Sequence, residues 1–458
     1  MNIRSVIKRV VPQILFKKIE PYGHWAEAVI EQTKAGFPAK NLQVIGVTGT
    51  DGKTTTCTLI AQMLRHSGKK VAMITTISVD YGDGKGEQPN PTRMTTMGAG
   101  PIITMLSKIK ENNVDWLVLE TTSHALAQHR VWGIPYSIAV FTNLGHEHLD
   151  YHGTFENYRD AKRLLFKQTS SNKSGFRVGI INADDATAPK FMSDIANPIT
   201  YGIQKGDYRP TNVISTPAGN IYHTKYKNVS YRINCHLPGT FNIYNSLAAA
   251  AVGQAIGLTR EQIERGIASL KSVEGRMTRV DEGQNFEVIV DYAHTPESFE
   301  KLFTEIKPLT KGRLISVFGS AGRRDEAKRA EQGRIAGQFC DIVVVTEEDD
   351  RDIDGLEILE QIASGAIKSG KIEDTNLFLV HRREDAVAKA IALAKKDDVI
   401  LLLGKGHEKS ILNNGPKAAE LRNELQDDDD PRRVIKRDYD EVKVAQAAIK
   451  HGIDKQAI

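Results

Sequence analysis

The sequence predicts an α/β protein, with a central P-loop domain on a mostly parallel sheet and a C-terminal Rossmann-like α/β domain. Two series of short apolar runs predict this class, because each run is followed by a helix-like stretch, as in parallel sheets covered by helices on both faces. A glycine-containing turn between an apolar run and a helix is the third observation. The length of 458 residues suggests about three domains.

The first series begins near Leu42 and predicts a central domain over residues 41–275. Its apolar runs are LQVIGV, VAMIT, WLVLE, SIAVFTNL and VGIINA, and a helix is expected from about Thr54. Polar and apolar residues alternate from about Tyr201 to Leu237. That period predicts antiparallel strands appended to the central sheet.

The second series begins near Arg276 and predicts a C-terminal domain over residues 276–458. Its strands are expected in FEVIVDYA, LISVFG, DIVVVT, NLFLV and DVILLLG, with helices such as GLEILEQIASGAI between them. Residues 1–40 are too few for a third full domain, so we expect a short N-terminal segment. The acidic run from Asp427 to Asp430 is expected to be a solvated loop.

Composition excludes several classes of protein. No stretch approaches the roughly 20 apolar residues of a membrane span. The 61 basic and 57 acidic residues are interspersed, and this small excess does not indicate a nucleic-acid partner. Cys57, Cys235 and Cys340 lie far apart without metal-ligand spacing, which argues against a zinc site or a disulfide scaffold. A cytoplasmic enzyme acting on small molecules is the expectation, and the oligomeric state is left open.

The strongest local signal is VIGVTGTDGKTTT, in which an apolar run ends at Val47 and a turn leads into a helix. Backbone N–H groups and the helix N-terminus in such a turn form a site for phosphate. Lys53 is expected against the β- and γ-phosphates, and the Thr54 hydroxyl is expected to bind Mg²⁺. The expected nucleotide-binding residues of the loop are Gly49, Thr50, Asp51, Gly52, Lys53, Thr54 and Thr55.

TGTDGKTTT resembles the TGTNGKTT loop of the Mur ligases, and further motifs follow in that family's order along nearly the whole chain. They are LETTSHALAQHRV, FTNLGHEHLDYHGTFENYRDAKRLLF, LPGTFNIYNSLAA, VEGRM, VDYAHTPES, VFGSAGRRDEAKR and LLLGKGHE. The DYHG and DYAHTP segments are most similar to the branch that adds the third residue of the peptidoglycan peptide. The resemblance implies an ATP-dependent ligase that activates a carboxylate as an acyl phosphate and joins it to an amino acid.

The same resemblance implies a metal and phosphate site at the carboxyl edge of the central sheet. Glu120 ends one strand and His148 follows another, so both are expected near the phosphate loop. With Thr54 they are expected to bind Mg²⁺. Lys162 is expected to carry a CO₂-derived carbamate, which converts a cation into an anionic oxygen ligand. Lys53, Glu120, His148, Lys162 and Arg276 are the expected catalytic residues.

Other motif positions are expected, by resemblance, to contact the two ends of ATP. Asn242 and Asn245 in FNIYNSLAA match the adenine-side contacts. Arg276 in VEGRM is expected to reach the phosphates, because a guanidinium suits bidentate phosphate contact. Asp291 and His294 in VDYAHTP are expected on the same ATP-facing surface.

The acceptor and the incoming amino acid also have expected residues. The acceptor set is Thr95, Thr96, Thr122, Ser123, Gln128 and Arg130, and the amino-acid set is Asp349, Arg351, Gly404 and Glu408. Glu408 is expected to pair with an ammonium group. The family's DNPR reads EDDR here, from Glu348 to Arg351. The arginine favours a carboxylated substrate such as meso-diaminopimelate, whereas the extra acids favour a diamine such as lysine, so both remain open.

The short segment 1–40 leaves the acceptor open as well. The family's N-terminal domain, which holds uridine diphosphate, is expected to be absent or reduced to a short segment. Residues 3–19 are basic and partly apolar, and they are expected either to pack on the central sheet or to lie at a membrane surface. The expected acceptor is a UDP-N-acetylmuramoyl-dipeptide. The alternatives are a lipid-linked peptidoglycan, poly-γ-glutamate or folate acceptor, or a nucleotide-binding protein without turnover.

Overall fold

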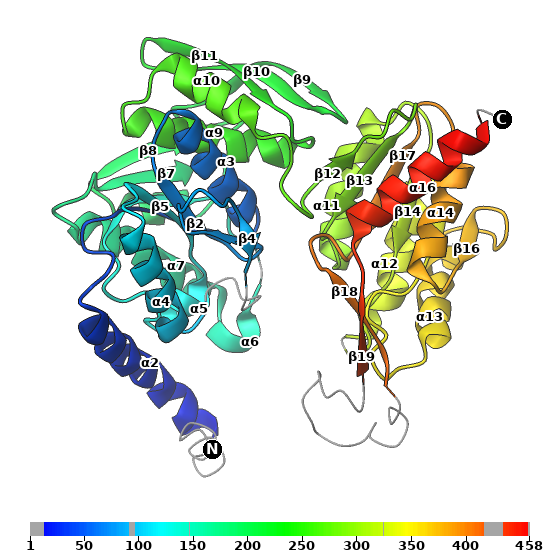
Figure 1. The fold of residues 1–458 in the computed structure, drawn as a ribbon, viewed down its shortest axis with the longest axis horizontal. Coiled ribbons are helices and arrows are strands. Elements are labelled where there is room, and N and C mark those ends of the chain that lie inside the picture. Colours follow the sequence, from blue (N-terminus) through cyan, green and yellow to red (C-terminus); the bar gives the residue numbers. More distant parts are fainter. Residues whose placement is uncertain (1–12, 91–96, 146, 324, 416–433, 457–458) are drawn as a thin grey trace. The chain divides into compact units, whose positions relative to one another are not determined.

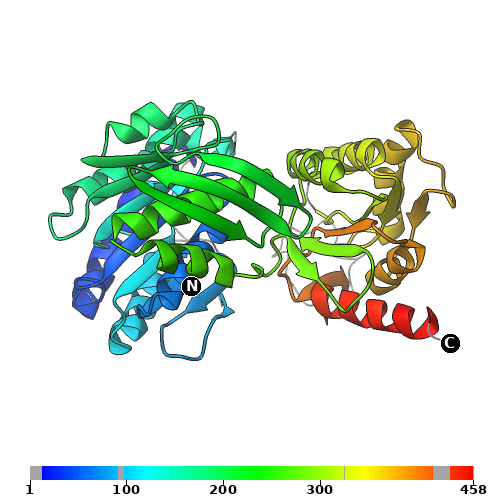
Figure 2. The same cartoon turned by 90° about the horizontal axis from the view of Figure 1, so that it is seen from above.

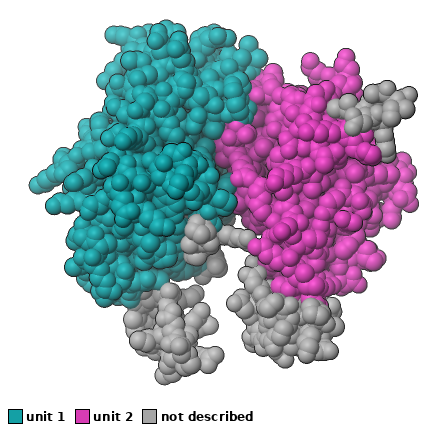
Figure 3. Space-filling view, in the orientation of Figure 1, with its two compact units in different colours: residues 1–214, 220–236, 240–271 teal, residues 215–219, 237–239, 272–458 magenta. Residues whose placement is uncertain are grey.

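The structure of the protein is a computed structural model, and it describes residues 13–90, 97–145, 147–323, 325–415 and 434–456 (Figure 1). The chain divides into two compact units, which Figure 3 colours separately. Unit 1 takes in residues 1–214, 220–236 and 240–271, and unit 2 takes in residues 215–219, 237–239 and 272–458.

Unit 1 is built on an eight-stranded sheet, and the predicted strands of the first series are confirmed. Six neighbouring strands run parallel, and β3 and β4 extend the sheet antiparallel at one edge. In spatial order the strands are β4 (Gln88–Pro89), β3 (Ser78–Asp80), β2 (Val71–Ile74), β5 (Trp116–Glu120), β1 (Gln43–Thr48), β6 (Tyr136–Phe141), β7 (Val178–Asn182) and β8 (Asn197–Tyr201).

Helices lie on both faces of this sheet (Figures 1 and 2). One buried cluster joins the strands to apolar residues of α4, α5, α7 and α8. Helix α3 contacts α9 and α10, and α2 contacts α4. The helices of unit 1 are α2 (Gln13–Ala35), α3 (Lys53–His66), α4 (Ala99–Glu111), α5 (Ser123–Ala127), α6 (Leu149–His152), α7 (Phe155–Ser171), α8 (Ala188–Met192), α9 (Thr240–Ala255) and α10 (Arg260–Ser269).

Helix α7 shows how the sequence turns a polar residue inward. Its N-cap Thr154 accepts a hydrogen bond from the Asn157 N–H, which fixes where the helix begins. Its buried residues recur at helical spacing and form one face: Tyr158, Ala161, Lys162, Leu165, Phe166 and Thr169. Lys162 therefore lies on the face that packs against the sheet rather than in water.

The antiparallel strands expected after Tyr201 are present, but the expectation that they extend the central sheet is wrong. The strands β9 (Pro210–Thr216), β10 (Gly219–Tyr226) and β11 (Val229–Cys235) form a separate three-stranded sheet. β10 and β11 pair antiparallel along their length. These strands satisfy their backbone groups with each other, and β11 contacts α10.

Unit 2 contains a six-stranded sheet, and its five predicted strands are confirmed. These five are parallel, and β12 adds an antiparallel edge. The order is β12 (Thr278–Val280), β13 (Glu287–Asp291), β17 (Val399–Leu403), β14 (Leu314–Phe318), β15 (Ile342–Val345) and β16 (Leu377–Leu379). Each of the runs β14, β15 and β17 is buried on both faces, as expected of a covered parallel sheet.

The remaining elements of unit 2 cover this sheet or follow it. They are α11 (Pro296–Ile306), the 3-10 turn η1 (Lys307–Leu309), α12 (Ala327–Phe339), α13 (Gly355–Lys368), α14 (Arg383–Leu393), the antiparallel pair β18 (Ser410–Asn414) and β19 (Val434–Asp438), and α16 (Glu441–Gln456). The run Asp427–Asp430 lies outside the described residues. Cys57, Cys235 and Cys340 are buried, and none of them forms a disulfide within the described residues. No helix in the described part of the chain combines the length and apolar character needed to cross a bilayer.

Candidate active site

The phosphate loop joins β1 to α3 with the backbone that the sequence predicts. Gly49 has φ 152°, and a Cβ there would lie 1.8 Å from the Thr142 hydroxyl oxygen. Gly52 is the N-cap of α3 with φ 79°, in the left-handed region that favours glycine. The Lys53 ammonium donates to the Thr50 carbonyl oxygen at 2.6 Å. The loop thus presents a helix N-terminus and a lysine, the chemistry of a phosphate site.

Thr54 and Glu120 meet at the carboxyl edge of the sheet. β1 and β5 are parallel neighbours, and Val47 is paired with Glu120 in their register. The Thr54 hydroxyl donates to Glu120 Oε2 at 2.9 Å, and the Thr76 N–H donates to the same oxygen at 2.9 Å. Both Thr54 and Glu120 are buried. Two hard oxygen ligands are therefore held side by side next to the phosphate loop, a donor set that suits Mg²⁺.

Lys162 reaches the same loop from α7. Its Nζ donates to the Gly49 carbonyl oxygen at 2.6 Å and lies 4.4 Å from the centre of the Tyr158 ring. Its side chain is buried. Burial and, after it, the positive charge of Lys53 hold the pKa of Lys162 well below the ordinary lysine value. The amine is therefore neutral over a wider pH range than a surface lysine.

His148 belongs to an aromatic group on the same side of unit 1. It has φ 55°, its side chain is half exposed, and its ring centre lies 4.7 Å from that of His124 and 6.0 Å from that of Tyr158. The Tyr158 hydroxyl shares a hydrogen bond with Thr50 Oγ1 at 3.1 Å. Tyr158 thus adjoins His148, Lys162 and the phosphate loop, and its importance was missed in the sequence. The signal was available, because Tyr158 lies four residues before Lys162 and shares its helix face.

The expected acceptor residues follow Glu120 directly. Thr122 is the N-cap of α5 and accepts from the Ala125 N–H at 3.2 Å, and Ser123 Oγ lies 3.0 Å from His152 Nε2. Gln128 is the C-cap of α5 and is buried, and Arg130 follows it. The segment with the expected acceptor residues Thr122 to Arg130 therefore begins at the end of β5, next to Glu120. Thr95 and Thr96 lie outside the described residues.

Asn242 and Asn245 lie on α9 and back the phosphate loop. Asn245 Oδ1 accepts from the Thr56 hydroxyl at 3.1 Å, and its Nδ2 donates to Asn242 Oδ1 at 2.9 Å. A Cβ at Gly52 would lie 2.5 Å from Asn245 Oδ1. The expected adenine-side residues are thus adjacent to the loop, whereas contact with adenine itself stays a prediction.

Unit 2 groups the other expected ATP-facing residues around Tyr292. The Arg276 guanidinium lies 5.1 Å from the centre of the Tyr292 ring, and His294 Nδ1 lies 2.9 Å from the Tyr292 carbonyl oxygen. Asp291 accepts from the backbone N–H groups of Met277 and Ala293 at 2.8 Å each. Burial raises the pKa of Asp291, and the charge of Arg276 opposes that rise.

Two of the expected amino-acid residues, Asp349 and Glu408, converge on Lys405, a residue that sequence reasoning missed. Its ammonium donates to Asp349 Oδ1 at 3.0 Å and to Glu408 Oε2 at 2.7 Å, although the side chain is fully buried. Glu408 Oε1 also accepts from the Tyr292 hydroxyl at 3.4 Å. Gly404 has φ 100°, and a Cβ there would lie 2.9 Å from Glu348 Oε2. The Glu408 carboxylate is thus oriented by a lysine within its own motif.

Arg351 is fixed in a different way. It has φ 56°, its backbone N–H donates to the Leu412 carbonyl oxygen at 2.8 Å, and its Nη1 donates to the Gly322 carbonyl oxygen at 3.3 Å. Arg351 is buried. Burial also raises the pKa of the neighbouring Glu348.

A P-loop α/β unit with a buried lysine and a threonine–carboxylate pair, joined in the chain to a second α/β unit, indicates a nucleotide-binding enzyme of the phosphoryl-transfer class. Comparison with known proteins narrows this class. Residues 47–253 match the Mur ligase middle domain, and residues 275–406 match the Mur ligase, glutamate ligase domain. The chain belongs to the Mur ligase family, and it is therefore an ATP-dependent, amide-forming ligase.

Among curated proteins, the chain is 40% identical over 380 residues to a UDP-N-acetylmuramyl-tripeptide synthetase from Borreliella afzelii (strain PKo). That alignment covers 82% of this chain and 74% of the relative. It is 37% identical over 406 residues to UDP-N-acetylmuramoyl-L-alanyl-D-glutamate–2,6-diaminopimelate ligase 1 from Clostridium acetobutylicum (strain ATCC 824), covering 88% of this chain and 80% of the relative.

Solved structures agree with the fold. A structure of a UDP-N-acetylmuramoyl-L-alanyl-D-glutamate–2,6-diaminopimelate ligase matches with a TM-score of 0.66 and 26% identity, covering 96% of this chain and 83% of that one. A folylpolyglutamate synthase from Mycobacterium tuberculosis, complexed with ADP, shares the fold with a TM-score of 0.64 at 16% identity; its match covers 83% of this chain and 91% of that one.

Proposed function

We propose that this chain is a tripeptide synthetase of peptidoglycan precursor synthesis, which joins meso-diaminopimelate or L-lysine to the D-glutamate of UDP-N-acetylmuramoyl-L-alanyl-D-glutamate. The single observation that carries the proposal is the convergence of the phosphate loop, the Thr54–Glu120 pair and buried Lys162 in unit 1. The names of the relatives that are about 40% identical supply the acceptor and the product. A cytoplasmic location is part of the proposal.

The reaction follows from the residues that each unit carries. The γ-phosphoryl group of ATP passes in line to the acceptor carboxylate, and ADP and an acyl phosphate result. The amine of the incoming amino acid attacks the acyl carbon, and a tetrahedral intermediate collapses to the amide and inorganic phosphate. In unit 1, Lys53 stabilises negative charge on the transferred group. In unit 2, Arg276 offers a guanidinium for phosphate contact, and Glu408 orients the amino acid. Positioning both reactants supplies much of the rate.

The residues present fit Mg²⁺ and a carbamate. The Mg²⁺ ligands we propose are Thr54, Glu120 and His148. Mg²⁺ bound there would neutralise negative charge on the phosphoryl oxygens. The neutral amine of Lys162 attacks CO₂, an N–C bond forms, one proton is released, and the side chain becomes an anion. The low pKa of Lys162 supports this step, because only the unprotonated amine is nucleophilic.

The catalytic proposal is tested by amino-acid-dependent phosphate release with UDP-N-acetylmuramoyl-L-alanyl-D-glutamate. We expect release with lysine or diaminopimelate and none with glutamate. Release that requires a folate or poly-γ-glutamate acceptor instead would assign the chain to another branch of the family. ATP binding without any phosphate release would contradict the proposed ligase reaction.

The carbamate is tested separately by ¹³C NMR in ¹³C-bicarbonate. We expect a carbamate resonance in the wild-type protein that is absent from Lys162→Ala. The matched control is Lys167→Ala, because Lys167 is exposed on the same helix. Identical spectra for the wild type and Lys162→Ala would contradict the modification.

A further inference from the structure

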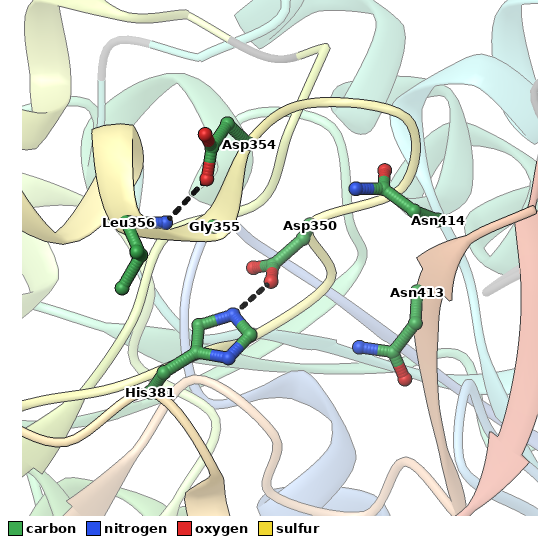
Figure 4. Close-up of a pocket in the computed structure, with 7 residues that line it drawn as sticks. All are labelled: Asp350, Asp354, Gly355, Leu356, His381, Asn413 and Asn414. Carbon is green, nitrogen blue, oxygen red and sulfur yellow. Dashed lines mark hydrogen bonds and ion pairs between the residues drawn. The ribbon is translucent and has the colours of Figure 1, made fainter. Parts of the chain in front are cut away.

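Unit 2 contains a cavity of about 390 Å³ beside the start of α13 (Figure 4). Its walls come from three segments that are distant in sequence: the turn after β15, the turn before α14, and β18. The polar residues that line it are Asp350, Asp354, His381, Asn413 and Asn414, and Leu356 adds an apolar side chain. No described lysine or arginine lines this cavity.

Asp350 gives the cavity a carboxylate with unused acceptor capacity. Its side chain is 4% exposed, and its Oδ2 lies 2.7 Å from His381 Nε2. Its Oδ1 is buried and accepts no hydrogen bond from any residue that the structure describes. A buried carboxylate oxygen without a donor is costly, so this atom indicates a ligand that donates. Burial also raises the pKa of Asp350, and the contact with His381 opposes that rise.

The position of Asp350 is fixed closely by its surroundings. At Gly355, a Cβ would lie 2.1 Å from His381 Nε2 and 2.3 Å from Asp350 Oδ2, so glycine is needed where the backbone passes this pair. Figure 4 shows the Asp350 carboxylate between His381 and the start of α13. Asp354 contributes a second carboxylate, and its Oδ1 accepts from the Leu356 N–H at 2.9 Å as the cap of α13. The cavity is therefore lined by two carboxylates, a buried one at Asp350 and an exposed one at Asp354.

A metal ion is the weaker occupant. Glu347, Asp350 and His381 have donor atoms close enough to share an ion. However, Glu347 Oε1 accepts from the Arg383 N–H and from Arg437, and its Oε2 accepts from Asn413 Nδ2 at 2.8 Å. The Glu347 carboxylate is thus already neutralised by arginine, which leaves Asp350 as the remaining carboxylate of this set. An ammonium group needs only acceptor oxygens for its three N–H groups, and Asp350 and Asp354 of the cavity wall supply them.

The cavity adjoins the residues expected to hold the incoming amino acid. Asp349 precedes Asp350, and its Oδ1 accepts from Lys405, which also pairs with Glu408. The same Asp349 oxygen accepts from the Leu412 N–H, one residue before Asn413 of the cavity wall. In contrast, Arg351 does not line the cavity and donates to the Gly322 carbonyl oxygen. Among the described residues, no lysine or arginine on the cavity wall could therefore bind a distal carboxylate.

We propose that this cavity binds the side-chain ammonium of the incoming amino acid, so that the substrate is a diamine with one carboxylate, of the lysine or ornithine type, rather than diaminopimelate. The inference rests on the proposed function, which requires an amino-acid substrate in unit 2. Asp350 and Asp354 accept from the ammonium, and Leu356 contacts the methylene chain. The distal carboxylate of diaminopimelate would meet two carboxylates and no described cation.

The test compares L-lysine, L-ornithine, meso-diaminopimelate and L-norleucine, which is lysine with a methyl group in place of the ammonium-bearing end. With the full chain and the UDP-linked dipeptide, we expect the KM of lysine or ornithine to be at least about tenfold below those of norleucine and diaminopimelate. Asp350→Asn should raise that KM about tenfold with little change in kcat, and leave the KM of norleucine unchanged.

Two further variants separate folding from recognition. Asp354→Asn keeps the helix cap, since asparagine caps as well as aspartate, and should also raise the KM of the diamine. Glu360→Gln is the matched control, an exposed acid on α13 outside the cavity, and should change nothing. A KM for diaminopimelate equal to or below that of lysine, or unchanged diamine KM values in both aspartate variants, would overturn the inference.

Equilibrium binding distinguishes this inference from the proposed function. If no amino acid supports phosphate release, the proposed function fails. Calorimetry with lysine and norleucine then still tests whether the cavity binds an ammonium group. Tighter binding of lysine, weakened by Asp350→Asn, supports the ammonium site. Equal binding of the two amino acids, or Mn²⁺ binding at the cavity with no preference for lysine, contradicts it.

Discussion

Lys162 in unit 1 and Lys405 in unit 2 are both almost fully buried, yet their surroundings act on them in opposite directions. Lys162 is 2% exposed and donates to the neutral carbonyl of Gly49, and its pKa is lowered. Lys405 is 0% exposed and pairs with Asp349 and Glu408, and its pKa is raised even though burial opposes the rise. Pairing rather than burial therefore decides whether a buried lysine is a nucleophile or a fixed cation.

The largest expected effect is on turnover. Lys162→Ala should lower ATP-dependent phosphate release by roughly 100-fold, because the variant loses a ligand-forming group beside the transferred phosphoryl group. Added formate or acetate should restore part of the rate by supplying a carboxylate to the space. Lys167→Ala should keep the wild-type rate. An unchanged rate in Lys162→Ala would contradict a role in turnover and would mean that Lys162, like Lys405, is a fixed cation rather than a nucleophile.

The second effect concerns stability and separates the two lysines most directly. Lys405→Met should lower the free energy of unfolding by about 2 kcal/mol, because it leaves the Asp349 and Glu408 carboxylates without their charged donor. Lys162→Met should be neutral or stabilising in metal-free buffer without CO₂, since it removes an amine that burial disfavours in its charged form. Urea unfolding measures both. Equal losses in the two variants would contradict the difference in pairing.

The smallest effect is a pair of opposite pH dependences. Lys162 has a folded-state pKa below the unfolded value of about 10.4, so stability should rise with pH between the two values. Lys405 has a folded-state pKa above the unfolded value. Its contribution should be complete below about pH 10.4 and be lost as pH rises through the folded-state pKa. Urea titrations from pH 7 to pH 11, with each methionine variant as reference, check both signs. Parallel curves for the two variants would contradict them.

Much of the fold could be predicted because its strands are continuous apolar runs. WLVLE and DVILLLG predict buried parallel strands wherever their partners lie in the sequence, and both are confirmed. The separate sheet of β9, β10 and β11 could not be assigned, because period-2 alternation identifies a strand but not which sheet it joins. The placement of Thr54 beside Glu120 followed from the rule that parallel strand ends meet at one edge.

The contacts that tune the site were harder to predict, because their partners are far apart in sequence. Lys405 is a single motif residue until Asp349, 56 positions earlier, is known to accept from it. The Asp350–His381 pair joins two turns 31 residues apart, and His381, unlike Asp350 of the EDDR segment, belongs to no recognised motif. Tyr158 is different, since its helix spacing from Lys162 was available and was not used.

The contact between Asn245 and the phosphate loop bears on when the nucleotide site becomes complete during synthesis. Thr56 and Asn245 are hydrogen-bonded across 189 positions of the chain, and Asn245 also lies against Gly52. At about 5–20 residues per second, roughly 10–40 s separate the emergence of these two residues from the ribosome. In a nascent chain that ends before α9, the phosphate loop therefore lacks the contacts with Asn245 that support it. ATP can stabilise unit 1 only after most of this unit has been translated.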